Sequence, residues 1–429
     1  MIRSWGSWGR SAAAVVVGIS LLAPISPGTS VVSAAPAPST SSVSPSIQIV
    51  LDNYPLPFDS APKIDNGVTL VPFRTIAEAL GIAVVWDAAS KTVVATGNDA
   101  SGQPAKVILT IGKKSAQVNG QAVELTAAPV VQQGRVLIPM AFFGRQFGAQ
   151  VSWESATKTV RIQSPKREMR TMGFYAISSY DQVSRLENLN SAAFGWAQIN
   201  QNGEFSTTDK DYKWPKADGD VTPESIAARV EDGYLMVHGL DGNRQTTKVL
   251  TDPAARDSSI QQMVSLAKDK GFKGVMLDYE GLGWKDDPAT AKKQFNEYTA
   301  LLSEQLKKEG LKLSLALPPL NGAYQGYDYK TLAGYADEIV IMAYLYVADK
   351  TPEPMNKVDA AISLALRQGV PKQKLLLGID MENENETTVL DKIGLAKRYD
   401  LAGVAFWRLG ILTQAEMKAI DSSVTKIGG

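Results

Sequence analysis

The sequence has 429 residues, 44% hydrophobic and 21% charged, a composition typical of an ordinary folded protein with two or three domains. Lys and Arg together number 44, as do Asp and Glu, so no net charge favours nucleic acid or an acidic membrane surface as partner. The absence of cysteine excludes disulfides, thiolate metal sites and cysteine nucleophiles. His238 is the single histidine, which excludes sites that need two or three imidazoles from one chain.

The N-terminus has the pattern of a signal peptide over residues 1–34. Two arginines precede an apolar run at residues 11–23, and a small-residue cleavage site ends at Ala34. An uncleaved membrane anchor is the alternative. Residues 35–46 are rich in Pro, Ser and Ala and are expected to form an extended linker. We therefore expect a secreted, extracellular protein with no membrane segment after signal cleavage.

Residues 47–164 contain an internal repeat. Trp86 and Trp153 occupy equivalent positions, 67 residues apart, and the same offset relates Pro72 to Pro139, Gly81 to Gly148, and Lys91-Thr92 to Lys158-Thr159. Each copy is predicted to form a short helix, a strand that carries the tryptophan, a turn and a second strand. Burial in the core is the favoured interpretation of both tryptophans, and stacking on sugars is the alternative.

The repeated Pro…Gly…Trp…Lys-Thr pattern resembles the copper amine oxidase N-terminal-like domain of secreted bacterial proteins. Oxidase activity does not follow, because a copper amine oxidase needs several histidine ligands and this chain has one. The resemblance instead implies a spacer or a domain that associates with the bacterial cell wall.

From residue 170 to residue 429 the pattern changes to strands that alternate with helices. Eight strands are predicted, at Thr171–Ala176, Ala193–Ile199, Tyr234–His238, Gly274–Asp278, Lys312–Leu317, Glu338–Met342, Lys374–Ile379 and Gly403–Trp407. Amphipathic helical stretches are predicted at Thr222–Asp232, Asp252–Lys270, Ala289–Glu309, Met355–Gln368, Val389–Arg398 and Gln414–Ile427. Eight βα units of this length predict an α/β fold, a (β/α)8 TIM barrel preceded by the smaller β-rich α+β repeat domain. A doubly wound open sheet is the alternative.

The fourth predicted strand ends in two carboxylates. Side chains alternate between faces along a strand, so Met276, Asp278 and Glu280 share one face. In a parallel barrel this end of the strand is where catalytic groups gather. Two adjacent carboxylates separate each other's pKa values, which suits one of them to keep a proton at neutral pH.

Strand 4 gives Asp278 and Glu280, strand 6 gives Met342-Ala-Tyr344, and strand 8 ends in Trp407. Together these strand ends resemble family 18 glycoside hydrolases, the group of chitinases and related N-acetylglucosaminidases. The family carries DGxDxDxE on strand 4, Met-x-Tyr on strand 6 and Trp on strand 8. The resemblance covers roughly residues 170–425, and the GFY that begins at Gly173 and the DYE ending are closest to the spore and cell-wall lytic branch.

Residue roles follow from that resemblance. It implies that Glu280 is the general acid and that Asp278 orients the 2-acetamido group of the substrate. Tyr344 would donate to the acetamido carbonyl, and Trp407 and Met342 would lie against the sugar. The acetamido oxygen would act as nucleophile, so neither cofactor nor metal is expected.

This chain departs from the family motif at three positions. Lys273 and Met276 replace the first and middle Asp of the strand 4 motif, and Leu345 replaces the Asp after Met-x-Tyr. With Met276 in place, Asp278 is expected to lose a hydrogen-bond partner and to keep only an apolar neighbour. Weakened catalysis is the expected consequence.

Further residues near the predicted strand ends are weaker candidates. Tyr175, Trp196 and Trp284 are predicted to line sugar subsites, and His238 is interpreted as a structural histidine. The carboxylates Asp380, Glu382, Glu384 and Glu386 are interpreted as a solvated loop, with weak cation binding or contact to a positively charged glycan as the alternative.

The favoured hypothesis is a secreted hydrolase that cleaves β-1,4 linkages beside N-acetylglucosamine, with peptidoglycan preferred to chitin as the polymer. The alternatives are a catalytically impaired, glycan-binding envelope protein and a structural envelope protein whose barrel is inert. Release of reducing sugar that depends on Glu280 distinguishes the first hypothesis from the other two.

Overall fold

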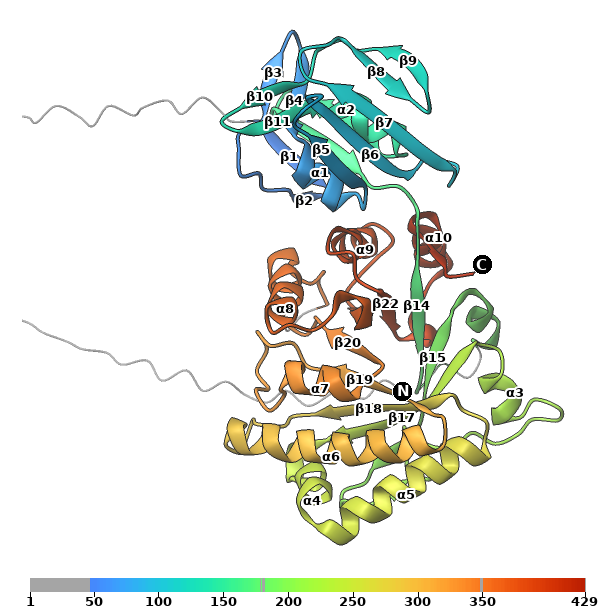
Figure 1. Ribbon diagram of the computed structural model, residues 1–429. Coiled ribbons are helices and arrows are strands. Elements are labelled where there is room, and N and C mark those ends of the chain that lie inside the picture. The colour runs from blue at the N-terminus through green and yellow to red at the C-terminus, as the bar shows by residue number, and fades with distance from the viewer. Residues whose placement is uncertain (1–46, 178, 180–181, 348–349, 429) are drawn as a thin grey trace, which may run out of the picture. The chain divides into compact units, whose positions relative to one another are not determined.

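The computed structural model describes residues 47–177, 179, 182–347 and 350–428 (Figure 1). The predicted signal peptide and linker lie outside the described residues. No helix in the described part of the chain is long and apolar enough to span a bilayer.

A β-rich domain with two short helices comes first along the chain. Its strands are β1 (Gln48–Leu51), β2 (Tyr54–Pro55), β3 (Lys63–Asp65), β4 (Val68–Pro72), β5 (Ala83–Asp87), β6 (Thr92–Asn98), β7 (Pro104–Thr110), β8 (Ser115–Val118), β9 (Gln121–Glu124), β10 (Val130–Gln132), β11 (Arg135–Pro139), β12 (Gln150–Glu154) and β13 (Thr159–Gln163). The helices are α1 (Phe73–Ala79) and α2 (Met140–Gln146). The strands form three sheets, ordered β12-β13-β1-β2, β10-β11-β4-β3 and β5-β6-β7-β8-β9.

The internal repeat is visible in the backbone as well as in the sequence. Each copy runs strand, helix, tryptophan-bearing strand, turn and strand, as β4-α1-β5-β6 and β11-α2-β12-β13. Gly81 and Gly148 follow the two helices with φ of +71° and +76°, and Lys91 and Lys158 turn the hairpins with φ of +52° and +51°. These left-handed residues explain why the same glycines and turn residues recur.

Burial of both repeat tryptophans is not what the structure shows. Trp86 is half-buried against the domain core, whereas Trp153 is 44% exposed. The interpretation of Trp153 as a core residue is therefore wrong. Val151, on the same face of β12, packs against the domain core, whereas Trp153 lies near the end of the strand and is left exposed.

The second region is a closed parallel barrel. Its eight strands are β14 (Arg167–Tyr175), β15 (Ser191–Ile199), β17 (Asp232–Leu240), β18 (Gly274–Glu280), β19 (Lys312–Leu317), β20 (Glu338–Met342), β21 (Leu375–Asp380) and β22 (Gly403–Trp407). Each strand pairs in parallel with the next, and β22 pairs with β14 to close the ring. The TIM-barrel prediction is confirmed, and the open-sheet alternative is wrong. The short strands β16 (Phe205–Ser206) and β23 (Val424–Lys426) extend β15 and β14.

Helices cover the outside of the barrel. They are α3 (Pro223–Ala227), α4 (Gln245–Thr251), α5 (Pro253–Asp269), α6 (Pro288–Lys308), α7 (Tyr329–Tyr335), α8 (Met355–Arg367), α9 (Thr388–Arg398) and α10 (Gln414–Ser423), with 3-10 turns at Val183–Asn188, Asp241–Asn243, Lys372–Lys374 and Leu409–Ile411. Asp252 and Asp287 cap α5 and α6, each before a proline at the first helical position. Two predicted helices are too long, because α3 ends at Ala227 and because residues from Val424 belong to β23.

Apolar residues pack in two layers, one on each side of the barrel wall. On β18, Val275, Leu277 and Tyr279 belong to the core between strands and helices, whereas Met276 lies in the separate core inside the barrel. The predicted alternation is confirmed. It directs Asp278 and Glu280 toward the barrel axis at the carboxyl end of the strand.

The amino-terminal ends of the strands hold an ion network whose two carboxylates are buried. The guanidinium of Arg170 donates to Asp232 at 2.8 Å and to Glu338 at 2.7 Å, and Lys312 donates to Asp232 at 2.8 Å. This end of a barrel serves the fold rather than catalysis, and removing one partner of a buried ion pair there is expected to destabilise it. The candidate catalytic carboxylates, Asp278 and Glu280, lie at the opposite, carboxyl-terminal end.

Candidate active site

The loop after β18 holds the paired carboxylates in place. The Tyr327 hydroxyl donates to the carbonyl of Tyr279 at 2.7 Å, and the backbone N–H of Leu282 donates to the same hydroxyl at 3.3 Å. Gly281 turns the chain away from the strand with φ of +86°. Glu280 is thereby fixed at the carboxyl end of the barrel, the end at which the active sites of parallel barrels lie.

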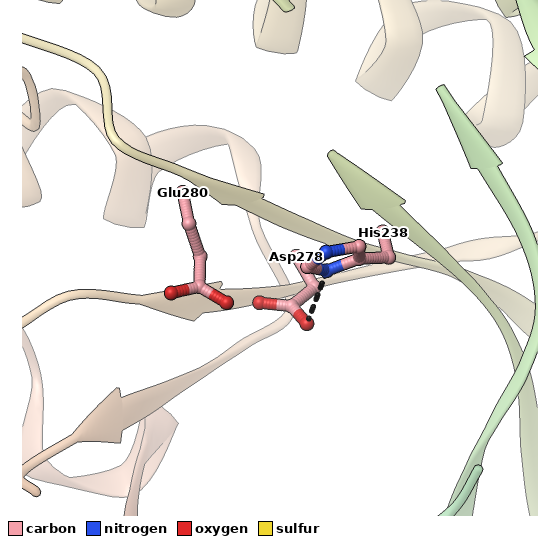
Figure 2. A group of neighbouring side chains, drawn as sticks. All are labelled: His238, Asp278 and Glu280. Atoms are coloured by element: carbon pink, nitrogen blue, oxygen red, sulfur yellow. Dashed lines mark hydrogen bonds and ion pairs between the residues drawn. The ribbon is translucent and has the colours of Figure 1, made fainter. Parts of the chain in front are cut away.

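His238 supplies the hydrogen-bond partner of Asp278. It is directly paired with Asp278 in the register between β17 and β18, so both side chains are on the inner face. His238 Nδ1 lies 3.3 Å from Asp278 Oδ2, and the N–H of the imidazole donates to the carboxylate (Figure 2). The ring of Tyr212 stacks on the imidazole with centroids 4.3 Å apart. The expectation that Asp278 keeps only an apolar neighbour is wrong.

The electrostatics of the trio suit an acid catalyst. Burial, and after it the negative charge of Asp278, raise the pKa of Glu280 to about 7, while His238 opposes the shift. Burial lowers the pKa of His238, but the hydrogen bond and charge of Asp278 outweigh burial and leave that pKa raised. Near pH 7 Glu280 therefore retains a proton that it can donate.

Asp278 has one oxygen available for a substrate. Its side chain is 4% exposed, and its Oδ1 has no hydrogen-bond partner among the described residues, whereas Oδ2 accepts from His238. A buried carboxylate oxygen without a donor is costly unless a ligand supplies one. The N–H of a bound acetamido group is such a donor.

The residues expected to contact the sugar are at the same end of the barrel. Burial raises the pKa of Tyr344 well above its ordinary value, and the charges of Asp278 and Glu280 add to the increase, so its hydroxyl stays protonated and able to donate. Trp407 is half-buried at the end of β22, with its ring edge-on to Phe174 at 5.2 Å. Met342 is buried in the core inside the barrel. Tyr344 and Trp407 pack against the same inner core.

Tyr175 and Trp196 do not line the site. Both are fully buried in the layer between barrel and helices, where their rings contact each other and Phe194. A side chain enclosed on that face cannot contact a sugar, so their prediction as subsite residues is wrong. Trp284, in the loop after β18, is 61% exposed beside Tyr324 and stays a subsite candidate.

The three departures from the family motif differ in how close they lie to the candidate catalytic carboxylates. Lys273 lies exposed before the first residue of β18, five residues from Asp278 and thus about 16 Å away at strand spacing. Leu345 is exposed, and its N–H donates to Glu353 at 2.7 Å. Met276 alone changes the site, because it lies fully buried directly beneath Asp278 on the inner face.

The acidic run after β21 is not a solvated loop throughout. Asp380 and Glu384 are buried, and Glu384 pairs with the buried Lys392 at 3.2 Å. Glu382, by contrast, is partly exposed beside Arg408 at 3.6 Å. Burial raises the pKa of Asp380 to about 6. The solvated-loop interpretation is therefore wrong for two of the four carboxylates.

Sequence reasoning undervalued His238 and missed Tyr212. His238 lies near the carboxyl end of β17, the strand beside β18, and is paired with Asp278. Alternation along β17 could have shown that its side chain faces inward. Tyr212 follows β16 in an irregular segment, and no periodicity marks it.

The ligand atoms of His238, Asp278 and Glu280 lie within 4.8 Å of one another, and these three residues could together hold a divalent cation.

A closed parallel barrel with an acidic pair at the end of its fourth strand and an aromatic residue at the end of its eighth has the arrangement expected of a barrel glycoside hydrolase. Comparison with known proteins gives the particular family. The model of glycosyl hydrolases family 18 matches residues 170–389, slightly more than half of the chain, and the copper amine oxidase N-terminal domain model matches residues 50–162. The chain belongs to glycosyl hydrolase family 18.

Individual relatives share parts of the barrel. Mouse chitotriosidase-1 is 30% identical over 166 residues, 32% of this chain and 35% of the mouse protein. The cortical fragment-lytic enzyme of Bacillus subtilis is 26% identical over 140 residues, 30% of this chain and 31% of that enzyme. The match thus spans about a third of these relatives. The spore cortex-lytic enzyme SleL of Bacillus megaterium superposes with a TM-score of 0.51 at 16% identity, over 72% of this chain and 80% of that chain, which shows the shared fold.

Proposed function

We propose that the protein is a secreted glycosidase that cleaves β-1,4 linkages next to N-acetylglucosamine by a substrate-assisted, retaining reaction. The observation that carries the proposal is the geometry of Glu280, whose pKa is raised to about 7, beside a hydrogen-bonded Asp278 on the inner face of a family 18 barrel. Peptidoglycan is the preferred polymer over chitin. Two relatives with names that refer to a cortex favour this choice, while chitotriosidase-1 represents the chitin alternative.

Glu280 performs the acid step. Its proton passes to the glycosidic oxygen as the bond to the anomeric carbon breaks, and the acetamido oxygen of the same sugar attacks that carbon. Water then opens the cyclic oxazolinium intermediate and transfers a proton back to the Glu280 carboxylate. The pKa of about 7 balances proton donation in the first step against acceptance in the second.

Asp278 and Tyr344 activate the acetamido group. The free Oδ1 of Asp278 accepts the acetamido N–H and stabilises the positive charge of the intermediate, while the Tyr344 hydroxyl donates to the acetamido oxygen. His238 holds Asp278 through its other oxygen. The role expected of a carboxylate at position 276 is therefore filled from the neighbouring strand.

Release of reducing ends tests the proposal. The purified protein is incubated with peptidoglycan and with a chitin oligomer, and Glu280→Gln serves as the matched control because it keeps the shape but holds no transferable acid proton. Turnover that falls at least about a thousandfold in the variant supports the acid role. Turnover that survives the substitution contradicts it.

A glycan-binding protein with an impaired barrel is the second candidate. Met276 favours it, because this buried thioether stands where the family carries a carboxylate. The two candidates predict different outcomes in the same assay. Retained affinity for either polymer without any turnover by the unmodified protein would establish the binding protein.

A further inference from the structure

Two grooves of the β-rich domain are copies of one another. One groove, of about 390 Å³, lies beside Trp86, and the other, of about 480 Å³, lies beside Trp153. Every residue that lines the groove at Trp86 has a counterpart 67 positions away that lines the groove at Trp153. The duplication of the sequence thus extends to the groove, and both copies keep a tryptophan in its lining.

Each groove is built from both repeats. The groove at Trp86 is formed by the start of α1 and by Gly134 at the β10–β11 turn, whereas the groove at Trp153 is formed by the start of α2 and by Gly67 at the β3–β4 turn. Each groove combines the helix of one repeat with the turn of the other because β4 and β11 pair antiparallel and lie side by side in Figure 1. Val71 pairs with Ile138, its own counterpart, so a local two-fold axis passes between them.

We propose that these twin grooves are binding sites for N-acetylhexosamine glycan strands, and that they hold the protein on the polymer that its barrel cleaves. This inference rests on the proposed function for the choice of glycan, but the grooves themselves are separate from the barrel.

The side chains suit a neutral sugar. Sugar rings bind to exposed indole faces, which combine a large apolar surface with a rigid shape, and Trp153 presents such a face at 44% exposure. Polar groups that can bond hydroxyls border each indole. Arg74 and Glu78 line the first groove, and Arg145 and Glu124 line the second.

The charge balance excludes a polyanion as the preferred ligand. In the first groove Asp59 and Glu78 offset Arg74 and Arg135, and Arg135 donates to Asp59 at 2.7 Å. A teichoic-acid-type phosphate polymer or a nucleic acid would need a surplus of cations at the groove. A pyranose with neutral hydroxyl and acetamido groups needs none.

Duplication raises the affinity for a polymer mesh. A wall presents many equivalent strand segments, so both grooves of one domain can be occupied at once, and the second contact forms at a high effective concentration. The grooves have also diverged, since Glu78 corresponds to Arg145.

Sedimentation with insoluble, acid-extracted peptidoglycan tests the inference in the full chain carrying Glu280→Gln, which prevents turnover. We expect Trp153→Ala to weaken binding about threefold to tenfold, and Trp86→Ala/Trp153→Ala more than about tenfold. Trp153→Phe retains an aromatic face and should recover most of the affinity. Val85→Ala, on the strand of Trp86 and 65% exposed, is the matched surface control and should bind like the parent.

Arg74→Glu reports on the first groove should the half-buried Trp86 prove necessary for folding, because Arg74 is exposed. Hydrolysis of a soluble chitin oligomer by the same variants with Glu280 intact reports on the barrel alone. Wall binding that depends on the tryptophans, together with no hydrolysis of peptidoglycan or of the chitin oligomer when Glu280 is intact, would support the groove sites and refute the proposed function. Wall binding indifferent to both tryptophans, or lost once anionic polymers are extracted from the wall, would overturn the glycan sites.

Discussion

The hydrogen bond from His238 to Asp278 replaces a contact that the family builds within one strand, and its removal has a calculable cost. In His238→Ala, the Asp278 Oδ2 loses a donor in a position that is 4% exposed. A hydrogen bond to a charged group contributes about 1.5–3 kcal/mol. Since 1.36 kcal/mol corresponds to a tenfold change in rate, we expect kcat to fall about 10- to 150-fold.

The assay is the release of reducing ends from a soluble oligomer, with kcat and KM determined separately. A positioning role predicts that KM changes little and that His238→Gln, whose amide can still donate, recovers part of the rate. Combining His238→Ala with Asp278→Asn should cost less than the two single losses together, because both remove the same contact. A kcat within twofold of the parent, or fully additive losses at unchanged thermal stability, would refute the reasoning.

Three further predictions follow from the site and the fold. Because Glu280 must be protonated to act and its pKa is about 7, kcat should be retained below that pH and fall as pH rises through it, and a rate that keeps rising to pH 9 would contradict this. Trp284→Ala should raise KM about threefold to tenfold with kcat unchanged, measured on long and short oligomers. Arg170→Met leaves the buried Glu338 without its cation and leaves Asp232 with Lys312 alone, so urea unfolding should show about 3–5 kcal/mol of lost stability; a loss below about 1 kcal/mol would contradict the network.

The sequence predicted the barrel because its strands are long apolar runs separated by capped helices. Asp252 before Pro253 marked the start of a helix that begins where expected, since capping depends on neighbours in the chain. The direction of Asp278 and Glu280 was likewise predictable, because alternation along one strand is a local property. Local rules thus sufficed for the architecture and for the acid pair.

Contacts across strands were harder to predict. Phe174 faces the inside of the barrel, so Tyr175, the next residue on the strand, faces the outer layer. An error of one residue in a predicted strand position reverses the predicted face. Trp196 lies where the β15–β17 register shifts, an irregularity that no spacing reveals. The partner of Asp278 required knowing that His238 is its register neighbour on another strand.

Methionine at position 276 also bears on how degenerate barrel enzymes are recognised. Neighbouring strands of a barrel hold their inward side chains side by side, so a task lost from one strand can be carried by the next without any change in backbone. A linear sequence motif cannot detect such a transfer, because His238 and Met276 are 38 positions apart in this chain. Chains set aside as inactive for an incomplete strand 4 motif should therefore be searched by barrel layer, with particular attention to a proton donor at the end of strand 3.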